Sequence, residues 1–371
     1  MKKNIIFINA LSAKLGGGVT YIINLLGYHS DPNVLVYIAC PNRSLLPKND
    51  NIHYVETPFA NKNIIFRAFW ELIILPKLLR KLNVNTLFVP GGMDFSLVNN
   101  SVKKVTMFRN MLPFDKVALF SLDSRLSILK NIVLKKFMIR TMNSANHVIF
   151  ISEYARLSVV KLLRLKSDSV IYHGIASNFT PSSTISDNSI LYVSRFETYK
   201  NHLNLIKAYN LLSEELKEKH SLILVGEGVE PALSLCNKYI ESNNLEDKVK
   251  ILGKVEYNLL PDLYRQCQLF VFPSSCENCP NILLEAIGCG AAIAASKTSP
   301  MPEFGKKAAL YFDETDVQSI NKVIIKVLEN QNLRNQLVVK SIDLRGDYTW
   351  QNTAYLTWKC LINIGNTDVQ K

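Results

Sequence analysis

Short apolar runs alternate along the chain with longer segments in which apolar residues recur every three or four positions. Runs such as 4–9, 34–39 and 103–108 are rich in β-branched residues and have the length of buried strands. Apolar strands separated by helices indicate a parallel sheet covered on both faces. The first half is predicted to contain strands at 4–9, 34–39, 51–55, 84–89, 103–108, 147–151 and 169–172, with helices at 19–28, 64–82, 121–141 and 153–165.

The alternation is interrupted at the polar, turn-rich segment 181–189 and then starts again. A second α/β domain is predicted to follow this linker. Its strands are expected at 190–194, 221–225, 249–252, 269–272 and 291–295, and its helices at 202–216, 231–242, 258–266, 280–288, 315–328 and 330–342, before a last helix at 350–364.

Two copies of one architecture fit a chain of 371 residues, which is too long for one ordinary core. Ligands of open parallel sheets bind beyond the carboxyl ends of the strands. The sequence therefore predicts an α/β protein with two Rossmann-like domains, residues 1–175 and 176–349. We expect its chemistry in a cleft between them.

Composition and charge narrow the class of protein. No run approaches the roughly 18 consecutive apolar residues of a membrane-spanning helix, and the start of the chain leads directly into a strand rather than a signal core. Seven scattered cysteines favour a reducing cytoplasm. Residues 1–172 hold 23 lysines and arginines against 9 acidic residues, whereas 173–371 hold 20 against 22. The basic half suggests an anionic partner, or else a merely solvated basic surface.

Three consecutive glycines, Gly16, Gly17 and Gly18, open the first helix shortly after the first strand. Glycine lets a backbone approach a ligand closely, and the amides of a helix start favour an anion. The segment matches neither the dinucleotide fingerprint nor the P-loop. Taken alone, the segment therefore favours a plain strand-to-helix turn over a phosphate-binding loop.

Two cations, Arg195 and Lys200, follow the first strand of the second domain. Cations fixed at a strand's carboxyl end can stabilise the charge that a diphosphate leaving group gains as its bond breaks. The alternative is that both are ordinary surface cations. Their place at the strand end favours the phosphate interpretation.

Glu277 and Glu285 follow the apolar strand 269–272, and they carry the most specific signal in the sequence. Pro280 suits a first helical position, which puts Glu277 in a loop and Glu285 inside a helix. The amides around Asn281 and Ile282 would then form a phosphate site at the helix start. One carboxylate can bind sugar hydroxyls and the other a ribose diol. A zinc site at the Cys276-x-x-Cys279 pair is not expected, because no second pair accompanies it.

The Glu277/Glu285 pair has E-x7-E spacing. Together with the Arg195/Lys200 pair, the glycine loop and the segment Val225-Gly226-Glu227-Gly228, it resembles the family 4 retaining glycosyltransferases of GT-B fold. The resemblance covers nearly the whole chain in the expected order. It implies that the helix from Trp350, residues 350–371, returns to pack on the first domain.

The same resemblance implies a role for each matching residue. Arg195 and Lys200 would hold the donor diphosphate, and Glu277 would contact the transferred sugar near its reacting carbon. It also implies retention of anomeric configuration, with the leaving phosphate accepting the acceptor's proton, and no metal or cofactor; no D-x-D motif is present. The donor-binding residues implied are Gly17 and Gly18 near the phosphates, Asn281 and Ile282 at the helix start, Glu285 at the ribose, and Gly253 and Lys254 beside the base.

The chain departs from the family pattern at two positions. Many members carry His-Asp near 108–110, where this chain has Arg109 followed by Asn110. Arg109 is expected either to orient an anionic acceptor or to pair with a carboxylate. His173 stands where asparagine is commoner, and it is expected either to contact the donor or to be a structural histidine.

The first domain also carries basic and apolar positions that suit an anionic membrane surface. Phe66, Phe69 and Trp70 are the aromatic members, unless they are core residues of a covered helix. We therefore expect a cytoplasmic enzyme, peripheral on the membrane if these positions are exposed, that transfers a hexose from a UDP- or GDP-linked sugar to a saccharide acceptor in the synthesis of an O-antigen- or capsule-like polysaccharide. A lipid-linked saccharide is the natural hypothesis for the acceptor. The alternatives are a GT-B nucleotide-sugar epimerase and a non-catalytic binding subunit; no nucleic-acid module is recognised. The basic positions are Lys130, Lys135, Lys136, Arg140, Arg156, Lys161, Arg164 and Lys166.

Overall fold

The computed structural model describes residues 3–14, 16–122, 124–182 and 187–366. The chain forms two compact units. The first comprises 1–114, 130–174 and 350–371, and the second comprises 115–129 and 175–349. The sequence had placed 115–129 in the first domain, whereas its contacts group it with the second unit. Residues 183–186 of the predicted linker lie outside the described residues.

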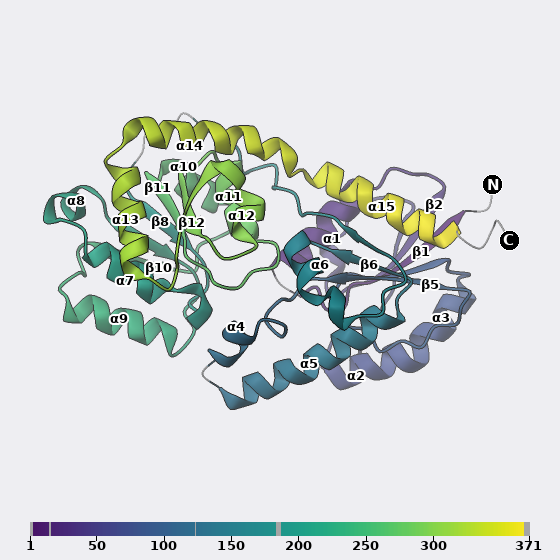
Figure 1. Ribbon diagram of the computed structural model, residues 1–371. Helices are drawn as coiled ribbons and strands as arrows, with labels where there is room; N and C mark the ends of the chain where they lie inside the picture. The colour runs from purple at the N-terminus through teal and green to yellow at the C-terminus, as the bar shows by residue number, and fades with distance from the viewer. Residues whose placement is uncertain (1–2, 15, 123, 183–186, 367–371) are drawn as a thin grey trace. The chain divides into compact units, whose positions relative to one another are not determined.

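The first unit is built on a parallel sheet of seven strands with the order β3-β2-β1-β4-β5-β6-β7. Helices lie on both of its faces, which is why strands such as β4 and β6 are buried along their whole length (Figure 1). The strands are β1 (Asn4–Asn9), β2 (Val34–Ala39), β3 (Ile52–Tyr54), β4 (Thr86–Val89), β5 (Lys103–Phe108), β6 (His147–Phe150) and β7 (Asp168–Val170).

The helices of the first unit follow the predicted pattern with one irregularity. The apolar segment from Ile64 begins as an α-helix, widens into a π-helix at Trp70–Ile74 and continues as an α-helix. The elements are α1 (Gly17–Gly27), η1 (Arg43–Leu45), α2 (Ile64–Phe69), η2 (Trp70–Ile74), α3 (Leu75–Lys81), α5 (Arg125–Ser144), whose first residues belong to the second unit, α6 (Glu153–Val159), η3 (Val160–Leu162) and α15 (Trp350–Asn366).

Helix α15 belongs to the first unit although it is the last helix of the chain. It packs on α1 and on strands β1, β4 and β5. The indole Nε1 of Trp358 donates to the carbonyl of Leu25 at 2.9 Å, and the hydroxyls of Thr357 and Tyr21 are 2.9 Å apart. These buried contacts fix α15 along α1.

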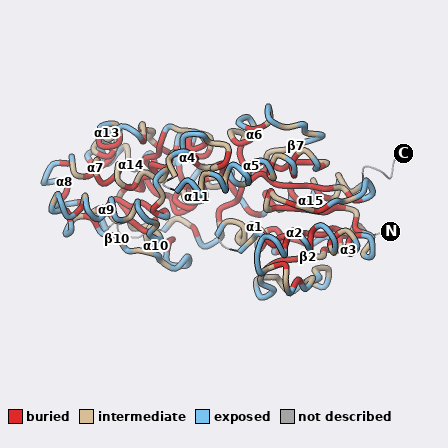
Figure 2. The backbone as a smooth tube through the Cα atoms, turned by 90° about the horizontal axis from the view of Figure 1, so that it is seen from below, coloured by how far each residue is buried: buried red, intermediate tan, exposed pale blue. Residues whose placement is uncertain are grey.

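The second unit repeats the design with six parallel strands in the order β10-β9-β8-β11-β12-β13. The central strands β8, β11 and β12 are buried along their whole length, while outer helices such as α8 (Glu214–Lys219) and α9 (Ala232–Ser242) carry many exposed residues (Figure 2). The strands are β8 (Ile190–Val193), β9 (Leu222–Val225), β10 (Val249–Gly253), β11 (Leu269–Phe272), β12 (Ile293–Ser296) and β13 (Ala309–Phe312).

Side-chain caps explain where several helices begin. The predicted helix 202–216 is divided in two, because Ser213 accepts a hydrogen bond from the amide of Leu216 and starts a new helix. Asp316 and Asn330 cap in the same way the helices that begin at Val317 and Gln331. The helices are α4 (Lys116–Phe120), η4 (Thr198–Lys200), α7 (His202–Asn210), α8 (Glu214–Lys219), α9 (Ala232–Ser242), α10 (Leu260–Gln266), α11 (Asn281–Gly288), α12 (Met301–Gly305), η5 (Lys306–Ala308), α13 (Val317–Leu328), α14 (Gln331–Leu344) and η6 (Arg345–Asp347).

Each sheet has a point where the direction of chain winding reverses. In the first unit it lies between β1 and β4, and in the second between β8 and β11. Ligands of open parallel sheets bind outside the carboxyl ends of the strands at this point. The loops after these four strands are therefore the place to look for a site.

Candidate functional site

In the second unit, Lys200 and Glu277 form an ion pair at the switch point. Lys200 ends η4 in the loop after β8, and Glu277 lies in the loop after β11. The ammonium nitrogen lies 2.5 Å from the Oε1 atom of Glu277, and the side chains are 11% and 14% exposed. Because water is largely excluded, this pair is electrostatically stronger than an exposed one.

Asn201 joins the two loops that carry this pair. Its amide group donates to the carbonyl of Pro273 at 2.8 Å and to the hydroxyl of Ser275 at 2.5 Å. In return, the amide of Ser275 donates to the carbonyl of Tyr199 at 2.9 Å. Asn201 has a φ of 56°, a left-handed conformation that asparagine tolerates better than most residues. The position of Lys200 relative to Glu277 is thus fixed by hydrogen bonds.

Arg195 has a different environment. Its guanidinium lies 3.5 Å from a carboxylate oxygen of Glu197 and 3.3 Å from one of Glu227, and its side chain is 58% exposed. Glu227 lies in the loop after β9, which we call the Glu227 loop. Glycine at position 226 lets this loop approach the end of β8, because a Cβ there would lie 1.8 Å from the carbonyl oxygen of Ser194. The structure thus brings Lys200 to Glu277 and holds Arg195 between two other carboxylates.

Glu285 is buried in α11, and both of its oxygens accept hydrogen bonds. The hydroxyls of Tyr257 and Tyr264 lie 3.1 Å from Oε1 and Oε2, respectively. Burial raises the pKa of Glu285 to about 7, although the two tyrosine hydrogen bonds act in the opposite direction. A carboxyl that titrates near neutral pH is a common feature of functional sites.

The start of α11 differs from the prediction by one residue. Pro280 is the N-cap and not the first helical residue, because its ψ of 79° is not helical. The amide of Asn281 donates to the carbonyl of Cys279 at 2.9 Å, and the phosphate site predicted at Asn281 stays a prediction. By helix geometry, the amides of Ile282 and Leu283 have no carbonyl one turn back within the helix.

Gly253 and Lys254 lie at the end of β10. Gly253 has a φ of 68°, and a Cβ placed there would meet no atom within 4 Å. Its carbonyl accepts the amide of Gly226 at 2.8 Å, which ties this strand end to the Glu227 loop. Lys254 is exposed beside it.

In the first unit, the glycine segment and Arg109 come together. Gly16 caps α1 and Gly17 begins it. A Cβ on Gly18 would lie 3.7 Å from a guanidinium nitrogen of Arg109, whose charged group is 5.4 Å from the centre of the Tyr21 ring. Glycine at position 18 therefore leaves room for the arginine beside the helix start, a combination suited to an anion.

His173 is packed inside the first unit. It is 1% exposed, and its ring lies 5.5 Å from that of Tyr21 and 5.4 Å from that of Trp350. Of the two interpretations left open for this residue, these contacts favour the structural one.

A buried polar network also supports the first unit. Glu71, in the π-helix, accepts hydrogen bonds from Asn9, Arg67 and the amide of Phe95. Burial raises the pKa of this carboxyl, while the Arg67 charge lowers it. Nothing in the sequence singled out these residues, because a lone glutamate in an apolar helix is more often solvated.

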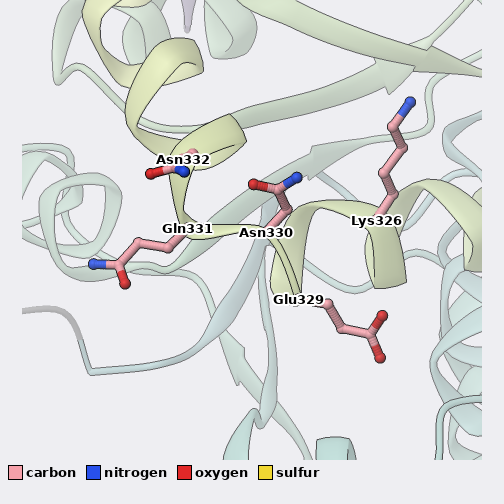
Figure 3. Close-up of a pocket in the computed structure, with 5 residues that line it drawn as sticks. All are labelled: Lys326, Glu329, Asn330, Gln331 and Asn332. Carbon is pink, nitrogen blue, oxygen red and sulfur yellow. The ribbon is translucent and has the colours of Figure 1, made fainter.

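Other features of the described residues do not gather catalytic side chains. Within these residues, no three histidine, cysteine or acidic side chains come together as a metal site. All seven cysteines, every one in a described range, are free thiols. The hollow of about 610 Å³ at the turn between α13 and α14 does not bring functional groups together either. Its side chains Lys326, Glu329 and Gln331 point away from one another (Figure 3).

Comparison with known proteins gives two matches that together span most of the chain. Residues 15–179 match the family described as Glycosyltransferase Family 4, and residues 179–342 match Glycosyl transferases group 1. The O-antigen chain mannosyltransferase B of Escherichia coli is 30% identical over 168 residues, which cover 45% of this chain and 44% of that protein.

Two further proteins resemble this chain. A Campylobacter jejuni N-acetylgalactosaminyltransferase, whose name includes the words diphospho-undecaprenol, is 33% identical over 156 residues, 40% of each chain. The Anabaena protein HepE in complex with UDP-glucose superposes with a TM-score of 0.73 at 15% identity, covering 97% of this chain and 99% of that one. The chain spans less than half the length of these curated relatives, and the structural likeness bears on the fold alone.

The two parallel α/β units and the two consecutive family matches agree with the resemblance seen in the sequence. The chain belongs to the family 4 glycosyltransferases of GT-B fold.

Proposed function

We propose that this protein transfers a hexose from a UDP- or GDP-linked sugar to a saccharide acceptor, with retention of configuration and without a metal. The observation that carries the proposal is the Lys200–Glu277 ion pair at the switch point of the second unit. It puts a cation for a leaving diphosphate beside a carboxylate for a sugar, which are the two charges that the chemistry needs.

Lys200 would stabilise the departing diphosphate. An ammonium group has three N–H donors, so one can remain on Glu277 while the others bind phosphate oxygens. Arg195 would join it by leaving its partners Glu197 and Glu227, which its exposed position permits. The amides of Ile282 and Leu283 at the start of α11 would bind the same phosphates. Glu277 would contact the sugar, and the phosphate oxygen that leaves would take the acceptor's proton.

The donor and acceptor classes are supported by the relatives. HepE is described with UDP-glucose, which supports a nucleotide-sugar donor here. The names of the E. coli and C. jejuni relatives include the words O-antigen chain and diphospho-undecaprenol, respectively. A lipid-linked saccharide in surface polysaccharide synthesis follows as the proposed acceptor. Arg109, beside the glycine segment, would bind an anionic group of that acceptor.

An exposed apolar surface on the first unit supports a lipid-linked acceptor. No helix of the described residues is long and apolar enough to cross a bilayer. However, the segment from α2 into η2 exposes a row of large apolar side chains, which we call the α2 apolar face. Trp70 is buried, as the core interpretation predicted, but Phe66 and Phe69, which precede it in α2, are exposed. The face consists of Ile64, Ile65, Phe66, Phe69, Leu72 and Ile73.

The charges around the α2 apolar face have one sign. Within residues 57–93 the only acidic side chain is Glu71, which is buried, whereas Lys62, Lys77 and Arg80 are exposed. Apolar side chains flanked by exposed cations suit the interface of an anionic leaflet. We propose that the enzyme docks there, peripherally on the cytoplasmic face of the membrane, a location that the seven free thiols also support.

The function is tested by incubating the protein with UDP- and GDP-linked sugars, with and without a membrane lipid extract as acceptor. We expect sugar transfer only when the acceptor is present, and an NMR spectrum of the product with the anomeric configuration of the donor. Conversion of the donor without an acceptor would identify an epimerase instead. Binding without any conversion would identify a binding subunit.

The docking surface is tested by flotation with vesicles of phosphatidylglycerol and phosphatidylcholine at low salt. We expect the wild type to float with anionic vesicles and the double variant I65S/F69S to stay at the bottom. The variant L235S, which changes an apolar residue of the second unit that is 52% exposed, is the matched control. Equal flotation of all three proteins would remove the α2 apolar face from membrane binding.

A further inference from the structure

Tyr257, Tyr264 and Glu285 form a cluster inside the second unit to which the proposed function gives only one role, that of Glu285 at the ribose. We propose that Tyr257 is a positioning residue which, with the buried Tyr264, orients the Glu285 carboxylate to accept the two ribose hydroxyls of the donor nucleotide. This inference rests on the proposed function, because it concerns the nucleotide that Glu285 would bind.

The geometry leaves the carboxylate half occupied. Its two oxygens offer about four lone-pair positions, and each oxygen accepts one tyrosine hydroxyl at 3.1 Å. One position on each oxygen remains for a ligand. A ribose diol presents two adjacent hydroxyl donors, which match a carboxylate whose plane is already fixed from the other side.

The two tyrosines have unequal surroundings. Tyr264 is fully buried in α10, and its ring lies 5.3 Å from that of Phe270. Tyr257 lies in the loop after β10 and is 46% exposed, with its ring 5.3 Å from that of Phe179. Tyr264 therefore holds Glu285 from the core, while Tyr257 holds it from a partly exposed loop.

The hydrogen bonds also determine when Glu285 is ionised. Burial is the largest influence and raises its pKa to about 7, and the hydroxyls of Tyr257 and Tyr264 favour the ionised form. Cys289, at the end of the same helix, also interacts electrostatically with this carboxyl. Loss of the Tyr257 hydroxyl should therefore raise the pKa of Glu285 further and leave less carboxylate at pH 7.

Nucleotide binding should then depend on pH in a defined direction. Ribose hydroxyls donate hydrogen bonds, so they bind the ionised form of Glu285 more tightly. Affinity should increase as pH rises through about 7, and binding near that pH should release a proton. In the variant Y257F the rise should occur at higher pH, with affinity about fivefold to tenfold weaker at pH 7 and recovered by pH 9.

The experiment is calorimetric titration of the 371-residue chain with UDP and with GDP between pH 6 and 9. Three variants are compared with the wild type: Tyr257→Phe, Glu285→Gln and, as matched control, Tyr311→Phe. Tyr311 belongs to the same unit and also donates one hydroxyl hydrogen bond, to the carbonyl of Lys306 at 2.8 Å. In the variant E285Q the nucleotide's own phosphate still titrates, but residue 285 does not. The difference between this variant and the wild type therefore isolates the titration of the Glu285 carboxyl.

We expect Y257F to raise the pH midpoint of the increase in nucleotide affinity. E285Q should remove the carboxyl's contribution to proton release, and Y311F should match the wild type. If E285Q binds nucleotide more weakly but Y257F has an unshifted pH midpoint, the role of Tyr257 is overturned and the proposed function remains intact. A uniform loss for Y257F at every pH would overturn it as well, because the tyrosine would then contact the nucleotide directly. An E285Q variant that binds like the wild type would instead remove Glu285 from the donor site.

Discussion

The ammonium of Lys200 lies 2.5 Å from the carboxylate of Glu277, although 77 residues separate them in the chain. Strands β8 and β11 are neighbours in the sheet, so the loops that follow them emerge side by side. The long connection between these strands is used to build β9 and β10 on the other side of β8. The topology of the sheet, rather than local sequence, creates this pair.

We expect Glu277→Gln to reduce sugar transfer by roughly a hundredfold or more, because the sugar would lose its charged partner in the transition state. The amide can still accept a hydrogen bond from Lys200, so the fold should persist. Initial rates and far-UV circular dichroism measure the two effects. Glu246→Gln, at an exposed position of the same unit, is the control, and unchanged turnover in E277Q would remove Glu277 from the site.

Asn201→Gly should separate positioning from folding. Glycine adopts the left-handed conformation of Asn201 without strain, but it cannot bind Pro273 and Ser275. We expect kcat to fall about tenfold or more while the melting temperature changes by only a few degrees. Asn201→Ala should add about 1 kcal/mol of backbone strain to the same catalytic loss. Wild-type kcat in the glycine variant would show that the two loops keep their relation without this residue.

Gly226→Ala should destabilise the second unit by about 3 kcal/mol or more, because the new methyl group would lie 1.8 Å from the carbonyl oxygen of Ser194 and φ is 155°. Gly346→Ala is the control, since a Cβ there meets no atom within 4 Å. Urea unfolding measures both. If the two variants unfold at the same denaturant concentration, the Glu227 loop does not need the close approach at Gly226.

The stability of the protein should depend on Glu285 in a predictable direction. Its pKa is raised from 4.5 to about 7 in the folded state, so the native protein binds more protons than the unfolded chain between these values. Stability should therefore fall as pH rises through this window, by up to about 3 kcal/mol from this group. Urea unfolding from pH 4 to 8 should show this decrease in the wild type and not in Glu285→Gln. Parallel curves for the two proteins would contradict the raised pKa.

Removal of divalent metal should leave transfer unchanged, because Lys200, Arg195 and the α11 amides would supply the positive charge for the diphosphate. The measurement is the initial rate after dialysis against EDTA, compared with the rate after addition of Mg²⁺ or Mn²⁺. A rate that depends on added metal would contradict this prediction.

The sequence predicted the fold well because both sheets are covered on two faces, which leaves continuous apolar runs such as β8 and β11. Strand β13 was missed because it lies at the edge of its sheet and its middle residues are only half buried. The π-helix at Trp70–Ile74 was also missed, since its apolar pattern resembles that of an ordinary helix.

The candidate site was predictable only in part. Lys200, Glu277 and Glu285 follow strands at recognisable positions, so their places could be read from the sequence. Tyr257 and Tyr264 could not, because they precede Glu285 by 28 and 21 residues on a different helix and loop. Asn201 resembles any polar residue at a helix start until its partners Pro273 and Ser275 are known.

The return of α15 to the first unit has a consequence for how the protein forms during translation. Residues 175–349 are complete in sequence before α15 is made. Until residues 350–366 leave the ribosome, α1 lacks the indole of Trp358 and the hydroxyl of Thr357 that cover it. The unit that contains the first strand of the chain therefore cannot complete its core until this last helix has been synthesised.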